Sequence, residues 1–192
     1  QPGSAFKPIV YSAALENGFL PNSIILDAPF VSEQGEGLKN WKPENYGKKF
    51  YGPSTLRKGI EKSRNLMTVR VAQSVGFEKI SQISKQLGIY KKVPELLSVS
   101  LGSNETTLLK ITNAYCSFVN GGKKVSPILI NRIQNRRGKT IFNTDTRDCQ
   151  GCKIVSKEGD SIFTPQIINN YDQVISKETA YQMTSLLEGV VK

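Results

Sequence analysis

The sequence predicts a mainly helical fold with one small β-hairpin. Six segments combine an apolar face with helix start and stop signals, and glycines separate most of them. One further region alternates apolar and polar residues on both sides of Arg137-Gly138, which is typical of a hairpin. The chain has 192 residues, of which 38% are hydrophobic and 22% charged, so it is long enough for one domain with a sizeable core.

The first helix is expected to begin near Ser4. Pro8 lacks a backbone N–H and is tolerated mainly in the first turn of a helix. Gly18 offers a stop. Between this helix and the next lies Pro21–Gly52, a long irregular segment, and loops of that length are often functional. The six expected helices are Ser4–Asn17, Ser54–Lys62, Leu66–Val75, Phe77–Leu87, Thr107–Val119 and Lys177–Val191.

The hairpin is expected from strands at Ile128–Asn135 and Lys139–Thr144, with Arg136–Lys139 at its turn. A polar insertion follows at about Asp145–Tyr171. We recognise no signal peptide and no apolar run long enough to span a membrane.

Cysteine is sparse. Cys149 and Cys152 fit a disulfide, a redox pair or half of a zinc site. A zinc site needs about four ligands, and the chain has no histidine and one distant cysteine, Cys116. A small structural disulfide is the preferred interpretation. Cys116 lies in an apolar helix and is expected in the core.

The net charge is +10, which can attract nucleic acid, anionic lipid or an acidic polymer. Lys and Arg are scattered, however, and no aromatic residues interleave with the densest run as a platform for single strands requires. We therefore expect solvated surface charge and no nucleic-acid partner. No Walker loop or Rossmann fingerprint occurs, and no cofactor is implied.

Ser4 and Lys7 form the one Ser-x-x-Lys pattern of the chain. Residues three apart on a helix share a face, so Lys7 would lie beside Ser4. A serine hydroxyl needs a nearby base before it becomes a good nucleophile, and without histidine Lys7 is the obvious candidate. The alternative is a helix start at which Ser4 is the cap and Lys7 a solvated charge.

Ser63-Arg64-Asn65 is the one Ser-x-Asn pattern and lies between two expected helices. It offers a hydroxyl that could relay a proton and an amide that could hold a peptide group. The alternative is a simple connection in which Asn65 caps the next helix.

In these motifs and several others, the chain resembles the transpeptidase region of class A penicillin-binding proteins over most of its length, least so in Asp145–Tyr171. The matching motifs occur in the family's order. They are Gln1-Pro2-Gly3-Ser4-Ala5-Phe6-Lys7-Pro8, Tyr11-Ser12-Ala13-Ala14-Leu15-Glu16-Asn17-Gly18, Trp41-Lys42-Pro43-Glu44-Asn45-Tyr46, Tyr51-Gly52-Pro53, Ser63-Arg64-Asn65-Leu66, Ser100-Leu101-Gly102-Ser103, and Ala114-Tyr115 with Phe118-Val119-Asn120-Gly121-Gly122.

The resemblance implies a peptidoglycan D,D-transpeptidase that works through a serine acyl-enzyme and is a target of β-lactams. Ser4 would attack the carbonyl between the two terminal D-alanines of a stem peptide. Lys7 would be the general base, Ser63 a proton relay and Asn65 a substrate-positioning group. The amine of Lys7 must be neutral at least transiently, so its pKa should be lowered by burial or nearby positive charge.

The family's third motif, Lys-Thr/Ser-Gly, does not occur in the chain. The resemblance suggests that it should follow soon after Lys192, and that the central sheet comes from regions flanking this chain. We therefore expect residues 1–192 to be a partial transpeptidase domain, the mainly α part of an α/β fold. Losing one oxyanion-hole donor typically costs roughly a hundred- to a thousandfold in rate, so this part alone should be inactive.

The implied partners are stem peptides and β-lactam antibiotics, at the periplasmic face of the cytoplasmic membrane. A membrane anchor, and often a glycosyltransferase domain, would lie upstream in the parent protein. Two alternatives stay open: a β-lactamase or D,D-carboxypeptidase with the same Ser4–Lys7 pair, and a non-enzymatic module such as a β-lactam sensor or a basic surface-binding domain.

Overall fold

The structure of the protein is a computed structural model. It describes residues 1–33, 39–145, 147, 149–150, 152, 164–168 and 171–192. The chain divides into two compact units. We call Gln1–Val125 together with Gln173–Lys192 the helical unit, and Ser126–Asp172 the second unit.

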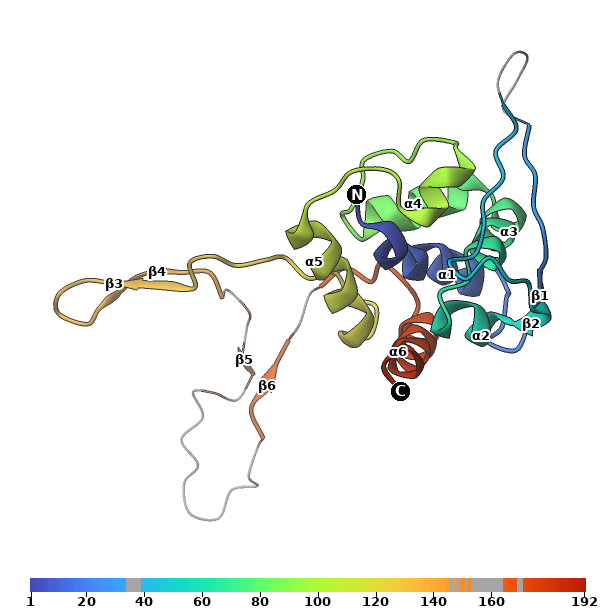
Figure 1. Cartoon of the computed structure of the whole chain (residues 1–192). Helices are drawn as coiled ribbons and strands as arrows, with labels where there is room; N and C mark the ends of the chain where they lie inside the picture. Colours follow the sequence, from blue (N-terminus) through green and yellow to red (C-terminus); the bar gives the residue numbers. More distant parts are fainter. Residues whose placement is uncertain (34–38, 146, 148, 151, 153–163, 169–170) are drawn as a thin grey trace. The chain divides into compact units, whose positions relative to one another are not determined.

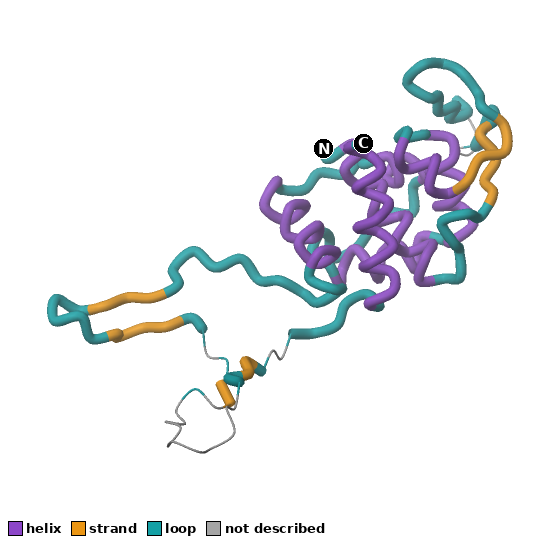
Figure 2. Tube along the Cα trace, turned by 90° about the horizontal axis from the view of Figure 1, so that it is seen from below, coloured by secondary structure: helices purple, strands orange, loops and turns teal. Residues whose placement is uncertain are grey.

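The helical unit contains six α-helices, two 3₁₀ turns and one pair of strands among its described residues (Figures 1 and 2). In chain order these elements are η1 (Gly3–Phe6), α1 (Lys7–Glu16), β1 (Ile24–Asp27), β2 (Gly52–Thr55), α2 (Leu56–Glu61), α3 (Asn65–Val75), α4 (Phe77–Gln86), η2 (Leu97–Leu101), α5 (Leu108–Val119) and α6 (Lys177–Val191).

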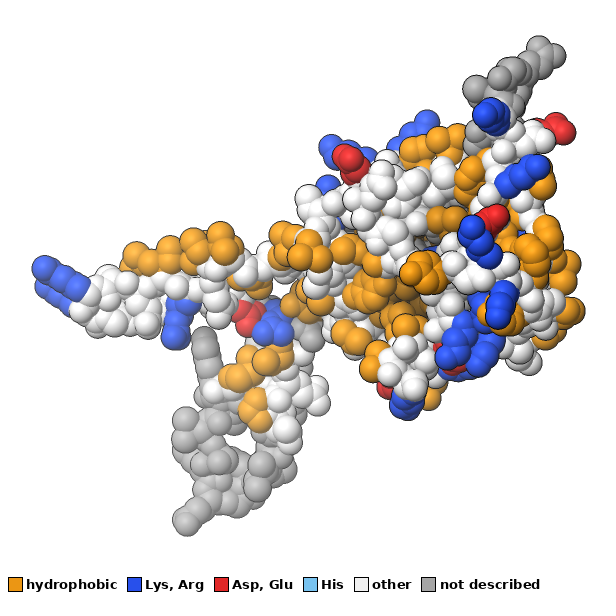
Figure 3. Space-filling model, viewed as in Figure 1, with side chains coloured by type: hydrophobic (Ala, Val, Ile, Leu, Met, Phe, Trp, Pro, Cys, Tyr) orange, Lys and Arg blue, Asp and Glu red, His pale blue; other side chains and the backbone are white. Residues whose placement is uncertain are grey.

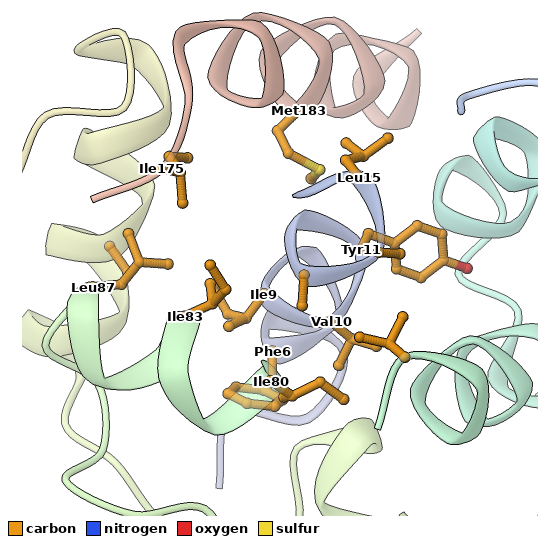
Figure 4. Packing of buried hydrophobic residues seen from close by; sticks show 14 of the residues in the cluster. Phe6, Ile9, Val10, Tyr11, Leu15, Ile80, Ile83, Leu87, Ile175 and Met183 are labelled. Carbon is orange, nitrogen blue, oxygen red and sulfur yellow. The ribbon is translucent and has the colours of Figure 1, made fainter. Parts of the chain in front are cut away.

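Helix α1 lies at the centre of the helical unit (Figure 1). Its residues from Lys7 to Leu15 are all buried, on every side of the helix. A helix that is enclosed all round needs apolar partners in several directions. Figure 4 shows Ile80 and Ile83 of α4 and Met183 of α6 packed around it, and α3 contacts it as well. The core therefore fixes the position of the helix that follows Ser4.

Strands β1 and β2 pair antiparallel, with Ile24 opposite Thr55 and Asp27 opposite Gly52. The sequence prediction missed this pair and placed the start of a helix at Ser54. The helix begins at Leu56 instead, because the Thr55 side chain accepts a hydrogen bond from Lys58 N and caps it. The expected irregular segment Pro21–Gly52 thus contains β1 near its start, and β2 begins at its last residue.

The other helix predictions are confirmed to within a few residues, and α6 matches its predicted range. The η2 turn was not predicted. The expectation for Cys116 was wrong: its side chain is half-buried rather than in the core, because it faces away from the packed side of α5 that Ala114 and Phe118 form.

The second unit contains the predicted hairpin, formed by β3 (Arg132–Gln134) and β4 (Thr140–Asn143), with a register shift after Ile133. Two short strands, β5 (Cys149–Gln150) and β6 (Gln166–Ile167), also pair there. Cys149 and Cys152 form a disulfide, in line with the preferred interpretation. Much of the polar insertion at 145–171 lies outside the described residues.

Lys and Arg side chains are scattered over the visible surface of the helical unit, and one group lies at the end of the hairpin (Figure 3). In the parts of the chain that the structure describes, no helix combines the length and apolar character needed to cross a membrane.

Candidate active site

Ser4 lies in the 3₁₀ turn η1, one turn before α1. Its side chain is exposed, whereas Phe6 two residues later is fully buried. Gly3 has a positive φ of 56° and its N–H donates to the carbonyl of Gly102 at 3.1 Å. The Tyr115 hydroxyl donates to the carbonyl of Ala5 at 2.9 Å. The turn is therefore held from both sides while the hydroxyl faces outward.

Lys7 is 2% exposed, so its amine lies inside the protein rather than in solvent. Its Nζ donates to the Ser63 carbonyl at 2.7 Å, to Ser63 Oγ at 2.9 Å and to Asn65 Oδ1 at 2.6 Å. Burial removes water from the charged form and lowers the pKa of Lys7 from 10.5 to about 8. An amine with that pKa is neutral in a useful fraction of molecules near neutral pH.

Ser63 lies between the Ser4 hydroxyl and the Lys7 amine. Its Oγ lies 3.1 Å from Ser4 Oγ, in a hydrogen bond, and 2.9 Å from Lys7 Nζ. Its backbone has a φ of 50°, an uncommon conformation for a residue with a side chain. The structure thus connects the Ser4 hydroxyl to the Lys7 amine through the hydroxyl of Ser63.

Asn65 is the first residue of α3. Its Oδ1 accepts the hydrogen bond from Lys7, and its Nδ2 donates to the carbonyl of Glu44 at 2.8 Å. The two bonds fix which end of the amide faces Lys7. All four residues selected from the sequence, Ser4, Lys7, Ser63 and Asn65, meet at one place.

The structure contradicts the simpler alternatives for both motifs. Ser4 makes no cap hydrogen bond, because Phe6 holds the cap position of α1. Lys7 is buried, not solvated. Asn65 does not cap α3, because Arg64 holds that position, and Arg64 makes no side-chain cap bond.

Sequence reasoning assigned no role to Asn45, Asp27 or Gly102, which support these residues. Asn45 Oδ1 accepts from the backbone N–H groups of Asn65 and Leu66, and Asn45 Nδ2 donates to Asp27. Asn45 and Gly102 belong to motifs that the sequence singled out, so the signal for them was present. Asp27 carried no such signal.

The arrangement combines an exposed hydroxyl, a second hydroxyl and a buried amine of lowered pKa. That combination can remove a proton from Ser4 and so activate it as a nucleophile. Within the described ranges, no group of three or more His, Cys, Asp or Glu side chains is placed to hold a metal ion.

The fold and this site define a class of protein. The family model "Penicillin binding protein transpeptidase domain" matches residues 1–192, and the chain belongs to that family. Among curated relatives, penicillin-binding protein 1A of Rickettsia bellii is 47% identical over 191 residues, and the protein of that name from Pseudomonas aeruginosa is 34% identical over 220 residues. Each match covers all of this chain but 24% and 27% of the relative. The chain therefore spans about a quarter of the length of these relatives.

Solved structures agree with this assignment. Penicillin-binding protein 1A from Haemophilus influenzae matches 98% of this chain with a TM-score of 0.82 and 29% identity, over 29% of its own length. Penicillin-binding protein A from Mycobacterium tuberculosis, determined as a penicillin G acyl-enzyme complex, matches 99% with a TM-score of 0.73. At 20% identity over 43% of that chain, it shows a shared fold. This chain is accordingly the mainly helical part of a penicillin-binding transpeptidase fold.

Proposed function

We propose that the protein carrying this chain is a peptidoglycan D,D-transpeptidase that forms an acyl-enzyme at Ser4. The hydrogen-bonded series from Ser4 Oγ through Ser63 Oγ to Lys7 Nζ is the observation that carries the proposal. The name penicillin-binding protein 1A among relatives and the penicillin G acyl-enzyme of a structural neighbour also support it. Stem peptides are the substrate class, and β-lactams bind as their mimics.

In the first step Ser4 Oγ attacks the carbonyl carbon of the penultimate D-alanine. The Ser4 proton passes to Ser63 Oγ as the proton of Ser63 passes to neutral Lys7 Nζ. The peptide C–N bond then breaks, the departing D-alanine amine takes up a proton from Lys7 through the same hydroxyl, and an ester to Ser4 remains.

In the second step an amine of a neighbouring stem peptide attacks that ester. Its excess proton leaves toward Lys7, the C–O bond to Ser4 breaks, and the Ser4 oxygen recovers a proton. A new amide joins the two stems. Asn65 holds Lys7 in the free enzyme and lies where it can also hold a peptide group of the substrate.

The burial of Lys7 suits both steps. A fully charged amine could not accept the first proton, and an amine with a very low pKa could not return it. A pKa of about 8 lies close to neutral pH, where both directions of transfer are accessible.

We place the site of action outside the cytoplasm, at the periplasmic face of the cytoplasmic membrane, where the polymer lies, with a membrane anchor elsewhere in the parent protein. Residues 1–192 form part of one transpeptidase domain with a polar insertion at about 145–171. No Lys-Thr-Gly or Lys-Ser-Gly occurs in these residues, and a polypeptide made of them alone is expected not to turn over substrate.

The test is covalent labelling of the intact protein with a fluorescent penicillin. We expect Ser4→Ala to abolish labelling, and mass spectrometry of the wild type to place the adduct on the peptide that contains Ser4. Ser74→Ala is the matched control, because Ser74 is an exposed serine at the far end of α3. Labelling that persists in Ser4→Ala, or an adduct on another residue, would overturn the proposal.

A further inference from the structure

Asn45 is a buried polar side chain beside the four site residues, and both the oxygen and the nitrogen of its amide make hydrogen bonds. It is 4% exposed. Its Oδ1 accepts hydrogen bonds from Asn65 N at 2.9 Å and Leu66 N at 3.3 Å. These N–H groups belong to the first turn of α3, where a helix has no partners of its own. Asn45 therefore caps α3 from a distant loop, in a place where Arg64 provides no side-chain cap.

The other end of the same amide is anchored. Asn45 Nδ2 donates to Asp27 Oδ1 at 2.7 Å and to the Lys49 carbonyl at 2.9 Å. Asp27 is fully buried at the end of β1, and Arg64 Nε lies 3.9 Å from its Oδ2. If the Asn45 amide were rotated by 180°, its oxygen would face the oxygens of Asp27 and Lys49, so the orientation of the amide is fixed.

The residue before Asn45 completes the connection. The carbonyl of Glu44 accepts from Asn65 Nδ2, which leaves Asn65 Oδ1 facing Lys7 Nζ. Arg64 also stacks on the Tyr51 ring, with its guanidinium carbon 3.3 Å from the ring centroid. The segment around Asn45 thus holds both the backbone and the side chain of the Ser63–Asn65 loop.

We propose that Asn45, anchored by Asp27, is a positioning residue that sets the Ser63–Asn65 loop against Lys7 and so controls acylation of Ser4. This inference rests on the proposed function. Asn45 acts through Asn65 and Ser63 and does not itself reach Ser4. Its loss lets the loop shift, which lengthens the Ser63 contacts and admits water to Lys7.

The test compares Asn45→Ala with wild type in the intact protein, by stopped-flow acylation with benzylpenicillin. We expect the acylation step to slow by roughly ten- to a hundredfold, since small displacements near reacting atoms have effects of that order. Non-covalent affinity should change much less. The pH midpoint of acylation should move upward, because water around Lys7 relieves the desolvation that lowers its pKa.

Asn113→Ala is the matched control. Asn113 also ties a loop with its amide, donating to the Val125 carbonyl at 2.7 Å, on helix α5. It should lower the unfolding temperature without moving the pH midpoint. A purely structural role of Asn45 would give the same result for both variants.

A rescue experiment keeps the proposal testable if Asn45→Ala folds poorly. N45D places a second carboxyl group against Asp27, whereas D27N/N45D restores a donor and an acceptor across the same contact. We expect acylation to be slow in N45D and to recover at least partly in the double variant.

The outcomes separate the two proposals. If wild-type protein is not acylated at Ser4, the proposed function fails. The inference about Asn45 fails by itself under a different result. In that case the wild type is acylated at Ser4, and both Asn45→Ala and N45D are acylated at the wild-type rate with an unchanged pH midpoint.

Discussion

Gly102 offers a sharp test of how the turn that carries Ser4 is held. It follows η2, has a φ of 77°, and its carbonyl accepts the hydrogen bond from Gly3 N. A Cβ at this position would lie 2.5 Å from Gly3 N and 2.7 Å from Gly3 C, and would overlap the Gly3 carbonyl oxygen. These neighbours are backbone atoms, so no side chain can rotate away. Gly102→Ala must therefore push the turn that contains Ser4.

The size of the effect follows from two terms. A left-handed conformation costs a non-glycine residue about 1–2 kcal/mol. Relieving the overlap with Gly3 needs a backbone movement of about 1 Å, and displacement of a reacting group on that scale costs roughly a hundredfold in rate. Gly88 has the same φ of 77° with nothing within 4 Å of a Cβ. Gly88→Ala therefore has the conformational cost but displaces no neighbouring backbone.

The assay is the second-order rate constant for acylation by benzylpenicillin, with thermal unfolding measured alongside. Both alanine variants should lower the unfolding temperature, and Gly102→Ala should in addition acylate on the order of a hundredfold more slowly than Gly88→Ala. Acylation rates for the two variants within about threefold of each other would refute the reasoning, since a factor that small needs no displaced nucleophile.

Two further predictions concern titrating groups. Because burial lowers the pKa of Lys7 to about 8, the acylation rate should rise about tenfold per pH unit below 8 and level off above it, and a flat pH profile would contradict this. Lys7→Arg should reduce the acylation rate roughly a hundred- to ten-thousandfold, while Lys79→Arg, at an exposed position, should change it little. Burial alone raises the pKa of Glu16, but hydrogen bonds from Ser176 and Thr179 outweigh it and lower the pKa. The folded state thus gains stability from ionised Glu16 above the carboxyl's unfolded pKa and loses it as pH falls. Glu16→Gln should therefore lower the unfolding temperature modestly at pH 7, because solvent screens this exposed carboxyl, and the difference should vanish in acid. Glu188 is the exposed control, and an equal loss of unfolding temperature at pH 7 in Glu16→Gln and Glu188→Gln would count against the assignment.

Local signals explain why the helices and the hairpin were predictable. Pro8 near the start of α1, Gly76 between α3 and α4, and Gly138 at the hairpin turn all act through the backbone of their own neighbourhood. The pair β1 and β2 escaped prediction because it sets Ile24 opposite Thr55, and no local pattern encodes a partner that distant.

The same distinction between local signals and long-range contacts applies to the candidate active site. The side chains that can carry the chemistry were found from short motifs, because few residue types can supply a nucleophile and a base in a chain without histidine. The lowered pKa of Lys7 was also expected, from the role that the resemblance implied, and its direction agrees with the structure, but the packing that causes it was not foreseen. That Lys7 is 2% exposed depends on packing of α1 against several helices, which the weak amphipathic pattern of α1 did not reveal.

By itself, the sequence determined which segments form helices, to within a few residues, and which hydroxyl, amine and amide stand in reactive motifs, since these depend on residues within one or two turns. Tertiary structure alone decided that Ser63 lies between Ser4 and Lys7. It also decided that Asn45 holds the Ser63–Asn65 loop and that Gly102 holds the turn that carries Ser4. Those contacts join residues 59 positions apart in the case of Ser4 and Ser63, and 20 in the case of Asn45 and Asn65. Contacts over such separations exist only once burial of the core has brought the segments together, so the lowered pKa of Lys7 is a property of the fold.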